Sequence, residues 1–344
     1  LIELEKNRFQ KKYTLFFYSF IVRMFPKKYV KTLLVSLNDL AKQHAKEKKG
    51  FTLKIIPQYL FKINTKSSKF SRGLSNKIKD FLVTNIEENY FILNFDHKES
   101  IEFILDSYIA RVHNDISSYN GFLSGFNNNA TAITGTGNSY YNRLFSSILK
   151  KEGVKVFRFN HGGERCFYVD LHFWENGDLF QTDIYFTYGK KWKIWLEKIV
   201  KKSGKKIKIQ SIGSDYHSKI YNKFVNNKNN KNNKNNKILY IPNSFLGEIR
   251  VFPFAKIIDP LLFDWQKYLI EVLQKNGFDV IYKRHPKGFS SEVNFLGDLA
   301  SVQSSKPMID ALEDADMVLV DTAGSAFVES LCAGKNIVLI NHLQ

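Results

Sequence analysis

Apolar and polar positions follow two different patterns over the last third of the chain. Some stretches are short and continuously apolar, as buried strands are: 238–241, 278–282, 317–320 and the residues from Asn336. Others repeat their apolar positions with helical spacing: 260–275, 308–314 and the residues from Ala326. Strands that alternate with helices are typical of a parallel sheet with crossover helices. We therefore expect an α/β domain in this part of the chain.

The same alternation begins earlier, at about residue 131. Strands are predicted at 132–134, 154–159, 183–187 and 206–212, and helices at 140–151 and 192–201. In open α/β sheets, ligands bind beyond the carboxyl ends of the strands. The loops expected at that edge are 135–139, 160–165 and 213–216. The pattern thus predicts a second α/β unit with one ligand-facing edge.

The first 110 residues are less regular. Residues 28–49 are predicted to be helical, and 52–62 and 90–94 to be strands. The segment 6–31 interleaves cations with aromatic residues: Lys6, Arg8, Phe9, Lys11, Lys12, Tyr13, Phe16, Phe17, Tyr18, Phe20, Arg23, Lys27, Lys28 and Lys31. A helix of this kind either lies in a membrane interface or packs its aromatic face on a domain core. The sequence leaves both interpretations open.

A polar repeat at 226–237, NNKNNKNNKNNK, divides the chain. Nothing in this repeat can pack in a core, so it is predicted to be a linker or loop. We expect an N-terminal domain at 1–225, with a basic helical extension at 1–50, and a C-terminal domain at 238–344. We also expect the C-terminal domain to be cut short and an upstream piece to precede residue 1, which is not a Met.

Composition narrows the class of protein and of partner. The chain has 344 residues, of which 44% are hydrophobic, and a net charge of +18 from 51 Lys and Arg against 33 Asp and Glu. This charge favours an anionic partner, unless the lysines only solvate the surface. The two cysteines, Cys166 and Cys332, lie far apart, which indicates no disulfide framework and fits a reducing cytosol. The apolar run at 15–22 is too short to span a membrane.

Residues 321–325, DTAGS, join a buried strand to a helix. Free N–H groups at a helix N-terminus bind phosphate, and Gly324 would let a ligand approach the backbone. The hydroxyls of Thr322 and Ser325 would bind the same ligand or cap the helix. Glu329, one turn further on, would accept hydrogen bonds from the two hydroxyls of a ribose, unless it is a solvated helix carboxylate. This loop predicts a nucleotide site.

The fragment KRHP at another strand end adds positive charge to that site. Together with the DTAGS loop, this fragment suggests that a nucleotide-activated donor binds here. His285 is a catalytic candidate because it would donate a hydrogen bond or positive charge to the phosphate of that donor, and Pro286 would stiffen the turn. Lys283 and Arg284 point to opposite faces of the strand, so one of them is expected to face the ligand. The alternative is a strand-end histidine that caps its neighbours.

Loops of the N-terminal half supply the acceptor-side candidates. They are Gly135, Gly137 and Asn138 in the first loop, and His161, Gly162, Gly163, Glu164 and Arg165 in the second. Transfer to an acceptor hydroxyl needs a base that takes its proton, or a carboxylate nucleophile if the reaction forms a covalent intermediate. Glu164 and His161 are the nearby candidates, unless the second loop is only a polar turn. Glu248 and Arg250, which follow the strand at 238–241, would face the cleft between the two domains. No carboxylate pair marks a metal site, so Lys, Arg, His and helix dipoles are expected to meet the phosphate charge.

These motifs, KRHP and then DTAGSAFVESLCAGK about 35 residues later, resemble the C-terminal domain of GT-B glycosyltransferases. The similar families are bacterial enzymes of capsule and surface-polysaccharide synthesis, namely the Kdo- and sialic-acid-transferring families and the CDP-glycerol glycerophosphotransferases. The resemblance covers residues from about 125 to 340. It implies two Rossmann-like α/β domains that face a central cleft, with residues 131–216 on one side and 238–340 on the other.

The resemblance also implies a function. The expected activity is a metal-independent transfer of a Kdo- or sialic-acid-like sugar from a CMP-activated donor, a co-substrate rather than a cofactor, to a surface-polysaccharide or lipid-linked glycan. The expected location is the cytoplasm, peripherally on an anionic membrane face. Two alternatives stay open: a CDP-glycerol or CDP-ribitol phosphotransferase, and a basic nucleic-acid-binding protein. Because no helix-turn-helix, zinc-finger or RNP pattern occurs, we expect no nucleic-acid partner.

Overall fold

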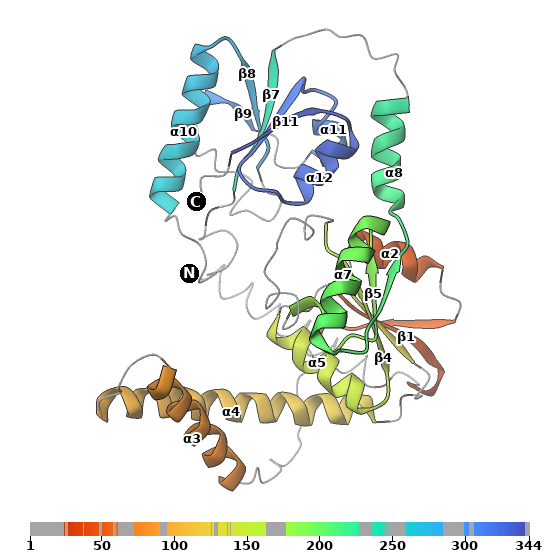
Figure 1. Ribbon diagram of the computed structural model, residues 1–344, viewed down its shortest axis with the longest axis vertical. Helices are drawn as coiled ribbons and strands as arrows, with labels where there is room; N and C mark the ends of the chain where they lie inside the picture. The colour runs from red at the N-terminus through yellow and green to blue at the C-terminus, as the bar shows by residue number, and fades with distance from the viewer. Residues whose placement is uncertain are drawn as a thin grey trace.

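The computed structural model describes residues 24, 27–36, 38–47, 50–57, 60, 72–89, 95–124, 126, 130–135, 137, 139–162, 177–226, 236–243, 245, 259–284, 299–302 and 306–340. The described strands form two parallel sheets (Figure 1). The first sheet has the order β2-β1-β3-β4-β5-β6, and the second has the order β11-β10-β7-β8-β9. The chain is thus an α/β protein with two successive parallel sheets, which is the GT-B-like architecture that we expected.

The first sheet contains the strands and helices predicted after residue 131. Its strands are β1 (Val30–Ser36), β2 (Phe51–Lys54), β3 (Thr131–Thr134), β4 (Lys155–Phe159), β5 (Ile184–Thr187) and β6 (Lys208–Ser211). Its helices include α2 (Asp39–Lys46), α5 (Tyr140–Lys151) and α7 (Lys190–Ser203). One face of the sheet is buried against α5, and Phe145 of that helix is fully buried. On the opposite face, Leu40 of α2 packs on Phe159.

The prediction that 28–49 is helical is wrong. Residues 30–36 form β1, which pairs in parallel with β2 on one side and β3 on the other. The physical reason is non-local, because Val30, Leu33 and Val35 enter a core built with residues about a hundred positions away. Only 39–46, as α2, is helical, after a short 3-10 helix η1 (Lys27–Tyr29). Most of the segment 6–31 and all of 90–94 lie outside the described residues.

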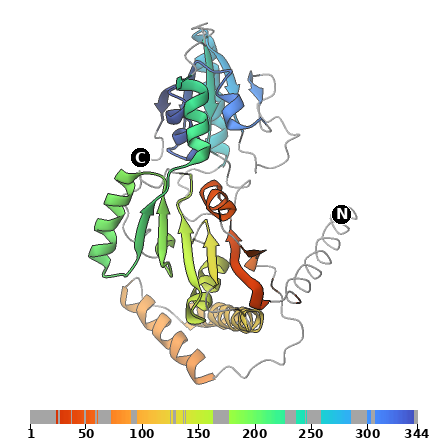
Figure 2. The same cartoon turned by 90° about the vertical axis from the view of Figure 1, so that its right-hand side faces the viewer.

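Two helices between β2 and β3 extend away from the first sheet (Figures 1 and 2). They are α3 (Arg72–Asn89) and α4 (Phe95–Leu123). Lys79 and Asp106 form an ion pair between them, with 3.1 Å between Nζ and Oδ1. The last turns of α4 reach the core of the first sheet, where Tyr119 and Phe122 are buried. No described helix is long and apolar enough to cross a membrane.

The second sheet agrees with the predicted alternation. Its elements are β7 (Lys237–Ile241), α10 (Asp259–Lys275), β8 (Asp279–Tyr282), β9 (Ser301–Val302), α11 (Met308–Ala311), β10 (Met317–Val320), α12 (Ser325–Cys332) and β11 (Asn336–Leu339). Central residues such as Leu239 and Val318 are fully buried. Gly334 follows α12 with φ of 64°, a left-handed conformation that suits glycine at the end of a helix.

The segment after β6 belongs to the second core. Helix α8 (Asp215–Tyr221) and the π-helix η5 (Asn222–Asn226) leave the first sheet and pack on the second, and Ile220 is fully buried beside Leu239. Lys223 of η5 pairs with Glu313 at 2.6 Å. We expected 213–216 to be a loop, but α8 already begins at Asp215, because the Ser214 side chain caps it. The domain boundary at 226–237 stays a prediction, since residues 227–235 lie outside the described part.

The carboxyl ends of the two sheets lie toward one another. Tyr216 is five residues past the end of β6, and Glu329 is in α12, which follows the carboxyl end of β10. The Tyr216 hydroxyl donates a hydrogen bond of 2.9 Å to Oε2 of Glu329. Because each residue lies close to the carboxyl end of its own sheet, this bond joins the two edges at which α/β proteins bind ligands.

Candidate functional site

The carboxyl edge of the second sheet is organised around a buried carboxylate. Asp321, the first residue after β10, is fully buried and accepts hydrogen bonds of 3.0 and 3.1 Å from the Tyr240 hydroxyl. It also accepts the backbone N–H of Asn243 at 2.9 Å. Burial, and then the nearby Asp321 charge, raise the pKa of Tyr240 above its usual range, so this phenol stays protonated as a donor. Asp321 therefore holds the end of β7 against β10.

The residues around Asn243 extend this network to β8. Thr322 Oγ1 donates to Oδ1 of Asn243 at 2.9 Å, and Nε2 of Gln266 donates to the Asn243 carbonyl at 3.0 Å. The Tyr282 hydroxyl at the end of β8 donates to Oε1 of Gln266 at 2.8 Å. The ends of three neighbouring strands are therefore connected by side-chain bonds, which fixes the loop that leads into α12.

No described side chain caps the N-terminus of α12. Its N-cap is Gly324, which has no side chain to accept the first N–H groups, and Thr322 directs its hydroxyl to Asn243. The φ of Gly324 is −94°, and a Cβ added there would meet no described atom within 4 Å. Neither backbone strain nor packing against the described residues explains glycine at this position. The first N–H groups of a helix that no side chain caps suit an anion.

Lys283 and Arg284 follow β8 directly, and both are buried, with exposed fractions of 7% and 5%. The backbone N–H of Lys283 extends the ladder to the Tyr240 carbonyl at 2.8 Å. Burial lowers the pKa of Lys283, and the charge of Glu329 acts in the opposite direction. The structure thus brings a buried cation into the field of the predicted ribose carboxylate. Glu329 itself is half-buried and bonded to Tyr216.

Asn38 connects the ends of neighbouring strands at the carboxyl edge of the first sheet. Its Nδ2 donates to the carbonyls of Gly135 at 3.1 Å, Phe159 at 3.1 Å and Asn160 at 2.8 Å. Its Oδ1 accepts the N–H of Ala41 at 2.8 Å and so caps α2. The start of the predicted loop at 135–139 is therefore bonded to the ends of β1 and β4. A Cβ at Gly135 would lie 2.9 Å from the backbone nitrogen of Asn38.

Gly137, the second predicted glycine of that loop, is buried against an arginine. A Cβ there would lie 1.8 Å from Nη1 of Arg158 and 2.6 Å from the carbonyl oxygen of Gly177. Arg158 is fully buried, and its guanidinium donates to Thr182 Oγ1 at 3.0 Å and to the Phe180 carbonyl at 3.2 Å. Burial lowers its pKa to about 10. Close packing thus requires glycine at 137, whatever ligand the loop meets.

The second predicted loop is described only in part. His161 follows β4 and is exposed, and Gly162 has φ of 67°, in the left-handed region. The remaining candidates lie outside the described residues: Asn138, Gly163, Glu164, Arg165, Glu248, Arg250, His285 and Pro286. The assignment of Glu164 or His161 as base, and of His285 to the donor phosphate, stays a prediction. Among the described residues, no cluster of three His, Cys, Asp or Glu could hold a metal ion.

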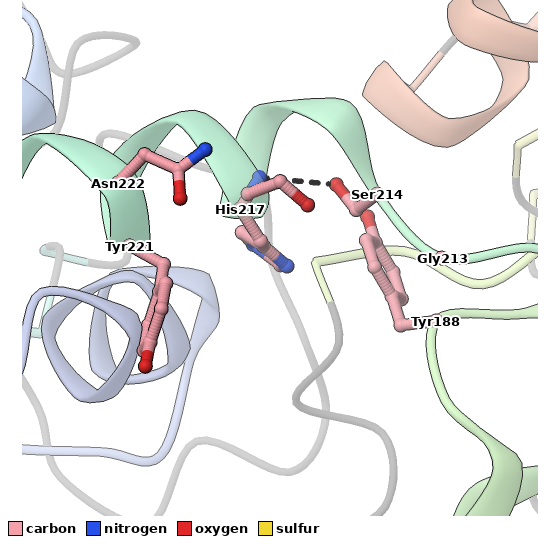
Figure 3. Close-up of a pocket in the computed structure, with 7 residues that line it drawn as sticks. Tyr188, Gly213, Ser214, His217, Tyr221 and Asn222 are labelled. Atoms are coloured by element: carbon pink, nitrogen blue, oxygen red, sulfur yellow. Dashed lines mark hydrogen bonds between the residues drawn. The ribbon is translucent and has the colours of Figure 1, made fainter. Parts of the chain in front are cut away.

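A hollow of about 470 Å³ opens beside α8, where the chain crosses from the first sheet to the second (Figure 3). Its lining residues are Tyr188, Gly213, Ser214, His217, Ser218, Tyr221 and Asn222. Tyr188 directly follows β5, and its ring lies 4.9 Å from that of His217, with an angle of 30° between the planes. The hollow is thus on the ligand-facing edge of the first sheet.

Sequence reasoning missed several residues that build these edges: Asn38, Tyr188, Tyr216, His217, Tyr240, Asn243, Gln266 and Asp321. Asp321 could have been found, because a carboxylate that ends an apolar strand must be paired when it is buried. An N-cap signal at Asn38 was also present, since Asn precedes the helix by one residue. No local pattern marks Tyr216 or Asn243, because their partners are 113 and 78–79 residues away.

Comparisons with known proteins give a likeness among solved structures only. No family model matches the chain, and no curated protein matches it. Among solved structures, it is similar to the crystal structure of the glycotransferase of kitacinnamycin. The identity is 11%, the TM-score is 0.34, and the match covers 92% of this chain and 81% of that one. A likeness of this degree assigns no function to the chain.

Proposed function

We propose that this chain is a glycosyltransferase that moves a sugar from a CMP-activated donor to a glycan acceptor. The observation that carries the proposal is the joint placement of Lys283, Glu329 and the open N-terminus of α12 at one sheet edge. Together they offer a cation and backbone N–H groups to a phosphate, and a carboxylate to ribose hydroxyls. The resemblance of the KRHP and DTAGS motifs to GT-B glycosyltransferases supports the same assignment.

The proposed chemistry uses the two facing edges. The acceptor hydroxyl attacks the anomeric carbon while a base, Glu164 or His161, takes its proton, and the bond from that carbon to the phosphate oxygen breaks. The leaving CMP gains negative charge, which Lys283, His285 and the N–H groups of α12 stabilise. The acceptor is proposed to be a surface-polysaccharide or lipid-linked glycan presented at the cytoplasmic face of a membrane. The sugar is proposed to be Kdo-like or sialic-acid-like.

Thermal unfolding with added ligands tests the proposal. Only a ligand that binds the folded state raises the unfolding temperature, and the shift grows with ligand concentration over the dissociation constant. We expect CMP to raise it, UMP to raise it less, and a random oligonucleotide to leave it unchanged. A shift with the oligonucleotide alone would instead support the nucleic-acid alternative, and no shift with CMP would reject the donor assignment.

A further inference from the structure

The hollow beside α8 has the lining of a sugar-binding site. The rings of Tyr188 and His217 are in contact, tilted by 30° with 4.9 Å between their centroids. Tyr221 is four residues after His217, on the same side of the helix. In Figure 3 the rings of His217 and Tyr221 extend from the same side of α8, and Tyr188 lies on that side, on the loop after β5. Tyr221 is 48% exposed, so its face is open to a ligand. Rows of aromatic rings bind the apolar C–H faces of pyranose rings.

Polar groups stand beside these rings. Ser218 and Asn222 line the same hollow, with a hydroxyl and an amide that match sugar hydroxyls as donors and acceptors. Ser214 is occupied, because its Oγ accepts the N–H of His217 at 3.2 Å. Three of the seven lining residues are aromatic and the others are small or polar, and a volume of about 470 Å³ is within the usual range of small-molecule sites.

The charge of the lining decides between a glycan and a nucleic acid. Bases also stack on aromatic rings, but single-stranded nucleic acid needs Lys or Arg for its phosphates. None of the described residues that line the hollow is Lys or Arg, although the chain as a whole carries 51 of them. The net charge of the chain is +18, but no described Lys or Arg lines this hollow. The lining therefore suits the uncharged face of a sugar better than a nucleic acid with its phosphates.

The position of the hollow connects it to the candidate donor site. His217 adjoins Tyr216 in α8, and Tyr216 donates to Glu329 at the edge of the second sheet. Tyr188 and Gly213 lie at the carboxyl ends of β5 and β6. We infer that this hollow is a glycan subsite, in which a pyranose ring of the acceptor stacks on Tyr188, His217 and Tyr221. The assignment of that glycan as acceptor rests on the proposed function.

Glycan binding without any nucleotide tests the inference. The probes are a printed array of neutral and acidic pyranose mono- and oligosaccharides, and a ten-residue oligothymidylate. We expect the wild-type chain to bind at least one glycan, and Tyr221→Ala to weaken that binding about tenfold, as removal of one stacked ring does. Tyr268→Ala is the matched control, because Tyr268 is 62% exposed on α10 and does not line the hollow.

Three results would overturn the inference: no glycan binds, Tyr221→Ala binds as the wild type does, or oligothymidylate binds through Tyr221. Circular dichroism of both variants establishes that each is folded. The outcome is separable from that of the proposed function. Glycan binding without stabilisation by CMP would leave a glycan-binding protein, whereas stabilisation by CMP without glycan binding would leave a nucleotide site and no subsite in this hollow.

Discussion

The two ligand-facing edges each carry a glycine-containing loop that leads into a helix, but the glycines are there for different reasons. In the first sheet, Gly137 is pressed against Arg158 and the Gly177 carbonyl. In the second, a side chain at Gly324 would meet no described atom within 4 Å. A glycine before a helix therefore reflects close packing in one case, and in the other it has no described neighbour that would exclude a side chain.

The edges also differ in how their strands are joined. At the first edge one amide, Asn38, donates to three backbone carbonyls and caps α2. At the second, a buried carboxylate, Asp321, and the Asn243 backbone carry the connections. The first edge is therefore joined through an amide and through the bonded hydroxyls of Ser36 and Thr134, whereas the second is joined through a buried carboxylate.

The largest expected effect separates the two glycines. Gly137→Ala should lower the free energy of unfolding by about 3 kcal/mol, because the added methyl group overlaps a backbone oxygen and a buried guanidinium held by its own hydrogen bonds. Gly324→Ala should lower it by at most about 1 kcal/mol, because no described atom opposes the methyl group and alanine is only a poorer N-cap than glycine. Urea unfolding followed by circular dichroism measures both. Equal losses in the two variants would show that the comparison is wrong.

The two asparagines give the next largest difference. Asn38→Ala removes an N-cap and the donor to three carbonyls, and should cost about 2 kcal/mol. Asn243→Ala keeps its backbone bonds to Asp321 and Gln266 and loses the side-chain bond to Thr322, so about 1 kcal/mol is expected. The same urea experiment compares them. A greater loss at Asn243 would mean that the second edge depends on its side chain after all.

Ligand binding should show the reverse order, with the second edge more sensitive. Lys283→Met should weaken CMP binding at least tenfold, because a charge-assisted bond to phosphate is lost. Lys335→Met is the control. Burial lowers the pKa of Lys335 as well, but this residue precedes β11 at the opposite edge, where its Nζ donates to the Ala315 carbonyl. Calorimetric titration with CMP that gives equal affinities for the two variants would remove Lys283 from the site.

A smaller effect is expected at the contact between the edges. Tyr216→Phe deletes the hydroxyl that donates to Glu329 and should lower the free energy of unfolding by about 1 kcal/mol. In a double-mutant cycle with Glu329→Ala, the two losses should not add, with a coupling of about 1 kcal/mol. Strict additivity would indicate that the bond contributes nothing to holding the two sheets together.

The smallest expected effect is on pH dependence. Burial lowers the pKa of Lys283 below the ordinary 10.5, so this lysine loses its proton earlier than an exposed one as the pH rises. Phosphate binds the charged form, so CMP affinity should fall with rising pH in the window between the lowered pKa and 10.5. The Lys283→Met variant should show a flat profile there. A wild-type profile that is flat over the same window would contradict a contact between Lys283 and phosphate.

The sequence alone determined the elements whose signals are local. The strand at 317–320, the helix at 140–151 and the alternation that makes two parallel sheets were all predicted, because apolar runs and helical spacing report burial directly. The DTAGS loop was also placed at a helix N-terminus, where the structure has it. These features depend on residues within about one element of each other, so no knowledge of distant contacts is needed.

Tertiary structure decided the rest. Val30–Ser36 is a strand because partners at 51–54 and 131–134 flank it, and those pairings outweigh any local preference. The helix at 215–221 joins the second core although it follows the last strand of the first sheet. Gly137 differs from Gly324 because Arg158, which is distant in the sequence, packs against Gly137, whereas no described atom lies within 4 Å of a Cβ at Gly324. Contacts between residues that are distant in sequence set these features, so only the folded chain reveals them.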